Sequence, residues 1–190
     1  MYKQLFILLY KIITVPASTW KFLSEKQDNK DNETFYKGYL FPVIGIIALL
    51  SFMGVIISLQ RFDVQQALKI TLKEIMIYGG SFYLVSFVLS EYVYPRFGLK
   101  KNKRSAELFT GYASSPIYVI AMLKTIFPAL FFLEILSLYT IYVVWTGAAY
   151  FLNIKEEQWI KFATFAGLLI VMTPFLLNFL INLLMPGMKI

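Results

Sequence analysis

The chain has 190 residues, of which 58% are hydrophobic and only 15% are charged, and its formal net charge is +7. A soluble domain has about a quarter charged residues, so this composition excludes an ordinary soluble globular protein. The chain also contains no histidine and no cysteine, which excludes Ser-His and Cys-His catalytic pairs, imidazole or thiolate metal sites, and disulfide bonds. We therefore expect no enzymatic activity, no cofactor and no metal.

Residues 1–37 are expected to form a cytoplasmic N-terminal segment. Four apolar residues near its start fall on one helical face, with Lys3 and Lys11 placed to reach lipid head groups: Leu5, Leu8, Leu9 and Ile12. Lys11 interrupts the apolar run after six residues, which favours a helix lying in the membrane plane over a cleaved signal peptide or an additional half-span. A polar link, residues 24–33, would connect this helix to the first span.

Residues 38–190 are expected to form a single transmembrane domain. Tyr39–Leu59 contains no charged side chain, and at about 1.5 Å per residue it is long enough to cross a bilayer as a helix. Runs such as residues 44–50 are apolar on every face, whereas barrel strands would alternate apolar and polar residues. The predicted fold class is therefore all-α, a polytopic helical bundle with five spans: Tyr39–Leu59, Ile70–Ser90, Leu108–Leu123, Ala129–Leu152 and Phe162–Leu184.

The orientation follows from the basic residues beside these spans. With the N-terminus inside, 13 of the 18 lysines and arginines fall on the inner side: Lys3, Lys11, Lys21, Lys26, Lys30, Lys37, Arg96, Lys100, Lys101, Lys103, Arg104, Lys155 and Lys161. The positive-inside rule then predicts a cytoplasmic N-terminus and an external C-terminus.

One basic cluster, Lys100, Lys101, Lys103 and Arg104, lies at a predicted inner membrane boundary. Each basic residue there gains about 1 kcal/mol from anionic lipids, so the cluster is typical of a topology signal, and a specific lipid or protein partner is the alternative. The +7 charge is distributed as an inner-leaflet preference requires, and we expect no nucleic-acid partner.

The link between the third and fourth spans contains only Lys124 and Pro128 as breakers, which predicts a tight hairpin whose limits could move by several residues. Glu134 lies close to this link. If the fourth span begins at Ala129, Glu134 is inside the bilayer and requires a partner or a raised pKa, as in a proton or cation site. If the third span continues to Phe127, Glu134 instead begins the next helix, where its charge suits the helix N-terminus.

Other polar or helix-bending residues also fall within predicted spans. Tyr112, Ser114, Ser115 and Asn178 could line a polar path together with Glu134, beside helix bends at Pro116 and Pro174. Asn178 and Asn182, four residues apart, should face the same way and hydrogen-bond a neighbouring helix.

Two short motifs resemble a known family. Pro16 is followed four residues later by Trp20, and Gly111 and Tyr112 precede Pro116 at the start of the third predicted span. These motifs and the five-span pattern resemble bacterial members of the Yip family, relatives of the Rab/Ypt-interacting proteins. The resemblance implies an integral protein of a bacterial inner membrane without a known catalytic reaction, in a family linked elsewhere to membrane traffic and membrane shape. It does not extend to Rab binding, because the longer N-terminal region of eukaryotic members is missing.

Two functions therefore remain open at this point. The first is a non-enzymatic scaffold or adaptor that assembles with itself or with other membrane proteins and presents Pro16, Trp20 and the Lys100–Arg104 cluster to cytoplasmic partners. In it, the Trp20 ring would lie among inner head groups as an interfacial anchor, and Pro16 would end the preceding helix. The second is a small transporter or channel built around Glu134.

Overall fold

The computed structural model describes residues 2–25, 32–59 and 63–184, and every regular element in these ranges is helical. The elements in chain order are α1 (Tyr2–Thr14), α2 (Pro16–Glu25), α3 (Asn32–Phe35), η2 (Tyr36–Leu40), α4 (Phe41–Leu59), α5 (Val64–Val88), η3 (Leu89–Val93), α6 (Tyr94–Arg96), α7 (Lys103–Ala113), α8 (Ser115–Ile126), η4 (Pro128–Leu138), α9 (Tyr139–Tyr150), η5 (Glu156–Gln158) and α10 (Trp159–Leu184). The all-α prediction is confirmed.

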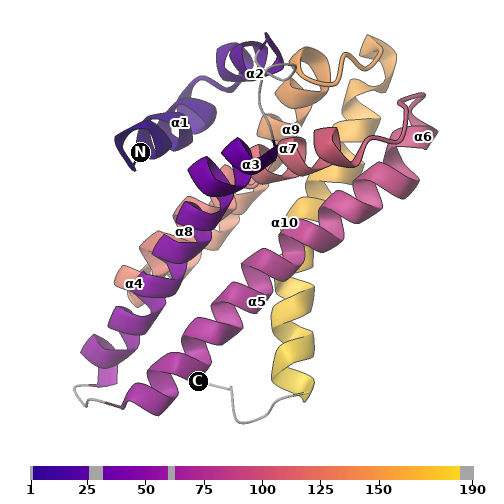
Figure 1. Ribbon diagram of the computed structural model, residues 1–190. Coiled ribbons are helices and arrows are strands. Elements are labelled where there is room, and N and C mark those ends of the chain that lie inside the picture. The colour runs from indigo at the N-terminus through magenta and orange to yellow at the C-terminus, as the bar shows by residue number, and fades with distance from the viewer. Residues whose placement is uncertain (1, 26–31, 60–62, 185–190) are drawn as a thin grey trace.

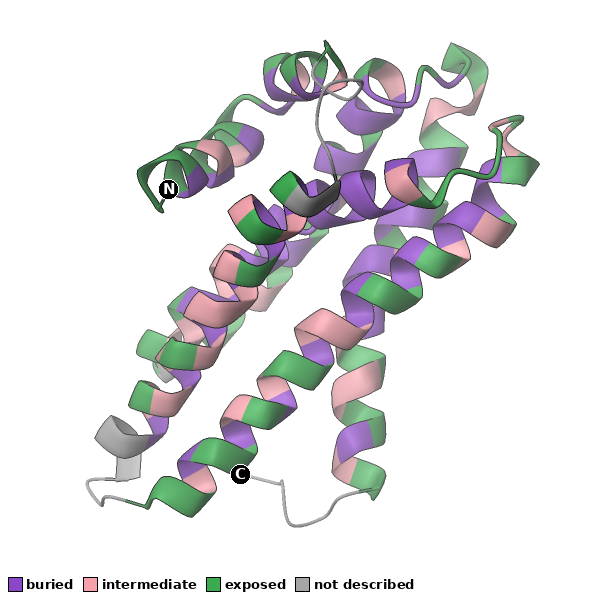
Figure 2. Ribbon diagram, viewed as in Figure 1, coloured by how far each residue is buried: buried purple, intermediate pink, exposed green. Residues whose placement is uncertain are grey.

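Four continuous helical segments are long and apolar enough to cross a membrane: Tyr36–Val55, Val64–Arg96, Ala129–Tyr150 and Glu156–Leu184. Four of the five predicted spans coincide with them. Many of their large apolar side chains point outward, for example Leu49, Phe87 and Phe179, which are 68%, 58% and 65% exposed. Figure 2 shows such exposed positions along α4, α5 and α10. Apolar surface on this scale is costly in water and favourable in lipid, so the protein is a membrane protein.

The helices are arranged with two distinct ends (Figure 1). At one end, called the N-terminal end below, α1, α2, α3, α6 and α7 gather around the tops of the long helices. The opposite end holds the end of α4, the start of α5 and the end of α10. Helix α1 packs on α8, and α2 packs on α9, so both N-terminal helices contact the long hairpin.

The third predicted span, 108–123, is not one straight helix. The chain breaks at Ser114 into α7 and α8, because Pro116 has no N–H to donate to the Tyr112 carbonyl. The Ser115 hydroxyl donates to that carbonyl instead, at 2.5 Å. The 12 residues of α8 rise about 18 Å, which is less than the roughly 30 Å of a hydrocarbon core. Pro116 therefore separates two helices, whereas α10 continues through Pro174.

A hairpin joins α8 to η4, as the breakers Lys124 and Pro128 predict. Phe127 leaves helical geometry with φ −126° and ψ 79°, and η4 then returns beside α8. The tip of α8 lies against α4 at Gly54, where an added Cβ would approach the Thr125 carbonyl oxygen to 2.9 Å. A glycine is therefore needed for this close approach between the two helices.

We predict that Gly54→Ala destabilises the protein by about 1–3 kcal/mol, because the new methyl group must push against the backbone of α8. Gly45→Ala is the matched control, since a Cβ at Gly45 in the same helix meets nothing within 4 Å. Thermal unfolding of both variants in lipid nanodiscs measures the difference. Equal melting temperatures for the two variants would show that α8 does not pack tightly on α4.

Candidate functional site

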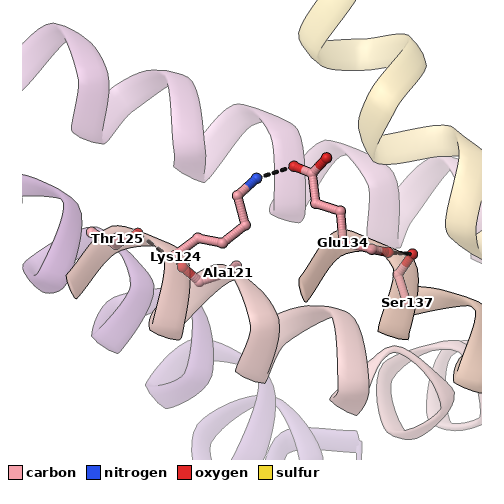
Figure 3. A network of polar contacts seen from close by, with 5 residues as sticks. All are labelled: Ala121, Lys124, Thr125, Glu134 and Ser137. Carbon is pink, nitrogen blue, oxygen red and sulfur yellow. Dashed lines mark hydrogen bonds and ion pairs between the residues drawn. The ribbon is translucent and has the colours of Figure 1, made fainter. Parts of the chain in front are cut away.

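The hairpin brings two charged side chains together. Lys124 near the end of α8 donates to the carboxylate of Glu134 on η4, and Figure 3 shows the two side chains directed toward one another across the turn. Glu134 lies beyond the first turn of η4, and its partner is this lysine. Of the two sequence interpretations, the structure therefore favours a paired carboxylate over a charge placed at a helix N-terminus.

A cavity of about 110 Å³ lies beside this ion pair, between α5, α8, η4 and α10. Its polar lining consists of Glu74, Tyr78, Lys124, Glu134, Ser137 and Asn178. The rest of its wall is apolar and is formed by Ile77, Ile117, Ile120, Ala121, Pro174 and Phe175. Three residues predicted from the sequence, Glu134, Asn178 and Pro174, thus meet at one site, which we call the charged cavity.

A second polar chain adjoins the charged cavity. Lys73 is buried on α5, and its Nζ donates to Oδ1 of Asn182 at 2.8 Å. Nδ2 of Asn182 in turn donates to Oδ1 of Asn178 at 3.3 Å. The two asparagines therefore face the same way, as their spacing predicts. Asn182 bonds the neighbouring helix α5, whereas Asn178 bonds Asn182. Hydrogen bonds of this kind connect helices where lipid offers no partners.

Glu74 and Lys73 are the site residues that the sequence did not single out. The second span was expected to begin at Ile70, which placed both residues near its entrance. Helix α5 begins instead at Val64, capped by the Asp63 side chain, so Glu74 lies ten residues inside the helix. The sequence signal for this earlier helix start is Asp63, a typical N-cap residue whose carboxylate can accept from the Gln66 backbone amide.

Tyr112, Ser114 and Ser115 do not line the charged cavity. The Ser115 Oγ lies 2.6 Å from the hydroxyl of Tyr39, and the ring centroids of Tyr39 and Tyr112 are 4.7 Å apart. Burial raises the pKa of Tyr112 to about 12, so its hydroxyl stays protonated at neutral pH. The continuous polar path expected through all five residues is therefore divided, and these three belong to a packed region nearer the N-terminal end.

That packed region, the aromatic centre, contains Trp20, Phe35, Tyr39, Phe109 and Tyr112. Trp20 is fully buried there, with its ring centroid 5.3 Å from that of Phe109. Its Nε1 donates to the carbonyl of Val143 on α9 at 2.9 Å. Gly147 makes room for the indole, because a Cβ at this position would lie 2.9 Å from the Trp20 ring.

The structure places the predicted interfacial anchor inside the protein, away from its surface. A fully buried Trp20 cannot lie among head groups or meet a cytoplasmic partner, and Pro16 is buried as well. The indole finds its hydrogen-bond acceptor inside the protein, on a helix more than a hundred residues away along the chain. Pro16 does separate two helices as expected, since α1 ends at Thr14 and α2 begins at Pro16.

The basic cluster lies at the N-terminal end, at the start of α7. Lys100, Lys101 and Lys103 are exposed, and Arg104 is partly exposed. Asn102 caps α7 by accepting from the Ser105 amide at 3.0 Å, and this bond holds the basic cluster at the start of the helix. Lys101 contacts Glu91 at 2.6 Å, so part of its charge is compensated within the protein.

Comparison of the chain with models of protein families, with curated proteins and with solved structures found no match. Within the described ranges, no group of three or more acidic side chains is placed to hold a metal ion. The fold and site define a polytopic α-helical membrane protein with a charged cavity between four of its helices.

We predict that Trp20→Ala destabilises the protein by about 3–5 kcal/mol, because it empties the aromatic centre and removes the indole hydrogen bond to the Val143 carbonyl. Phe22→Ala is the control, since Phe22 lies on the same helix and is 48% exposed. Limited proteolysis in inside-out vesicles should cleave residues 1–37 faster in the Trp20 variant alone. Equal cleavage in both variants would contradict a role for Trp20 in holding α1 and α2 to the body.

Proposed function

We propose that this protein is a non-enzymatic, multi-pass membrane protein that acts as a scaffold or adaptor in membrane organisation, comparable to the Yip family that its Pro16–Trp20 and Gly111–Pro116 motifs resemble. The observation that carries this proposal is the aromatic centre. By burying Trp20 against α7 and α9, it fastens the N-terminal helices to the membrane helices, so that the N-terminal end offers one firm surface.

The charge of this surface supports the same proposal. Its exposed basic side chains include Lys3 and Lys11 in α1, Lys21 in α2, Arg96 in α6, and Lys100, Lys101 and Lys103 beside α7. Basic residues beside a membrane attract anionic lipids and acidic protein surfaces. We propose that this end faces the cytoplasm, and that its partners are inner-leaflet lipids together with a second copy of the chain or another membrane protein.

Helix α1 is proposed to lie in the head-group region of the inner leaflet. Leu5, Leu9 and Ile12 are buried against the protein, so its outward face is left to contact the surroundings. That face exposes Phe6, Ile7 and Tyr10 beside Lys3 and Lys11. Aromatic and apolar residues flanked by lysines are typical of a helix that lies in a membrane interface.

We further propose that α8 is a fifth membrane segment, in a bacterial inner membrane, with the N-terminus inside and the C-terminus outside. Because α8 and η4–α9 are two arms of one hairpin, the chain returns to the N-terminal end whether the hairpin tip crosses the outer face or stops within the bilayer. The side on which each terminus lies is the same in both cases. The surplus of basic residues at the N-terminal end supports this orientation.

A second candidate is a small transporter or channel, and the charged cavity specifically favours it. Ionisable residues inside apolar helices are costly and often mark an ion or proton pathway. Here Glu74, Lys124 and Glu134 line one cavity between four elements. This candidate requires ion or solute movement into proteoliposomes that is reduced in Glu134→Gln.

The scaffold proposal predicts that a photo-crosslinking residue at Lys100 gives discrete protein adducts in native membranes. The adducts should decrease severalfold when Lys101 and Lys103 are changed to glutamine, since the charges attract the partner. The same crosslinker at Lys69, which is exposed near the start of α5, serves as the control. Adducts to lipid alone at Lys100, or identical protein adducts at both positions, would contradict the proposal and leave the cluster as a topology signal.

A further inference from the structure

We propose that the charged cavity is a binding site for a monovalent cation, either a proton or an alkali-metal ion, with Glu74 as its principal ligand. The inference deepens the second function above and rests on it for its biological use, but the site can exist in a protein that transports nothing.

The first argument is charge balance. The cavity is lined by two carboxylates, Glu74 and Glu134, and by one ammonium group, Lys124, so its wall carries one more negative than positive charge. Lys124 is directed to Glu134 (Figure 3). Lys73 also acts electrostatically on Glu74, but it does not line the cavity, and its Nζ donates to Asn182.

A carboxylate in apolar surroundings is costly. Glu74 lies ten residues inside α5, within the apolar segment Val64–Arg96, and its side chain is only partly exposed. In surroundings of low dielectric constant, such a group either takes up a proton or binds a cation. Because the excess is a single charge, a monovalent cation neutralises the cavity, whereas a divalent ion would leave it positive.

The other polar groups of the wall suit such a ligand. They are the hydroxyls of Tyr78 and Ser137 and the side-chain amide of Asn178, so the donors available beside Glu74 are oxygen atoms. Hard cations prefer oxygen ligands. A volume of about 110 Å³ has room for an ion with several water molecules, and it is smaller than the roughly 300 Å³ of the smallest typical organic-ligand pockets.

Lys124 then acts as a fixed internal counter-charge that limits cation affinity. Its removal would raise the excess charge of the wall from one to two, whereas neutralising Glu74 would abolish the excess. The two changes therefore shift cation binding in opposite directions. A merely structural role for these residues would make both variants less stable without changing their response to cations.

The experiment is thermal unfolding of the full chain in lipid nanodiscs, in NaCl, KCl or LiCl against N-methyl-D-glucamine chloride at equal ionic strength, and in the organic salt over a pH series. A ligand that binds only the folded state raises the melting temperature with the logarithm of its concentration. For the wild type we expect this rise with an alkali cation or, if the ligand is a proton, with falling pH. The charged and titratable groups around Glu74 in the pH series are Lys73, Tyr78, Lys124 and Glu134.

The rise should be lost in Glu74→Gln, should become larger in Lys124→Met, and should be unchanged in Glu91→Gln, whose carboxylate pairs with Lys101 at the N-terminal end. If Glu74→Gln does not fold, Lys124→Met alone tests whether removing the lysine strengthens the response to cations. A cation or pH response that is the same in wild type and Glu74→Gln, or no response in the wild type, would overturn the proposal. Binding without ion flux in proteoliposomes would keep the site and reject the transporter.

Discussion

The structure depends on one constraint, which is that lipid offers no hydrogen bonds, so polar groups within the membrane must find partners in the protein. Two places show how this shapes the fold. At Pro116, which lacks an N–H, the Ser115 hydroxyl satisfies the Tyr112 carbonyl and the chain divides into α7 and α8. At Trp20, the indole N–H reaches the Val143 carbonyl, and this contact brings the N-terminal helices onto the membrane helices. Local polar satisfaction thus determines where helices break and which helices pack together.

The same constraint explains why the two ends of the molecule differ in character. Toward the N-terminal end, aromatic rings pack closely around Trp20, and the buried carboxylate of Glu107 lies 3.8 Å from Lys103. Between α5, α8, η4 and α10, in contrast, a cavity persists, and its wall holds two carboxylates and one lysine. The packed region suits a protein that holds partners in place, and the cavity suits a protein that binds an ion. One chain can do both, since the two regions share α8 but use different residues.

The sequence predicts the helical architecture well, because apolar runs as long as a bilayer have few alternative structures. It also places Glu134, Asn178 and Pro174 at one site, since all three lie in apolar runs. It fails for Trp20, because the space left by Gly147 lies 127 residues away and cannot be seen in the local pattern. It fails for Glu74, because the sequence does not show whether a helix begins before or after charged residues at the edge of an apolar run. The only sequence signal for the break at Ser114 is Pro116. Whether this proline bends a helix or divides it depends on nearby hydroxyls that can bond the freed carbonyl.

The central claim is that the chain crosses the membrane with its N-terminal end in the cytoplasm and its C-terminus outside. Reporter fusions at the N-terminus, at residue 101 and at the C-terminus test it most directly, using a fluorescent protein that matures only in the cytoplasm and a phosphatase active only outside. The account predicts cytoplasmic fluorescence at the first two positions and phosphatase activity at the third. Both termini on the same side of the membrane, or residue 101 outside, would contradict it.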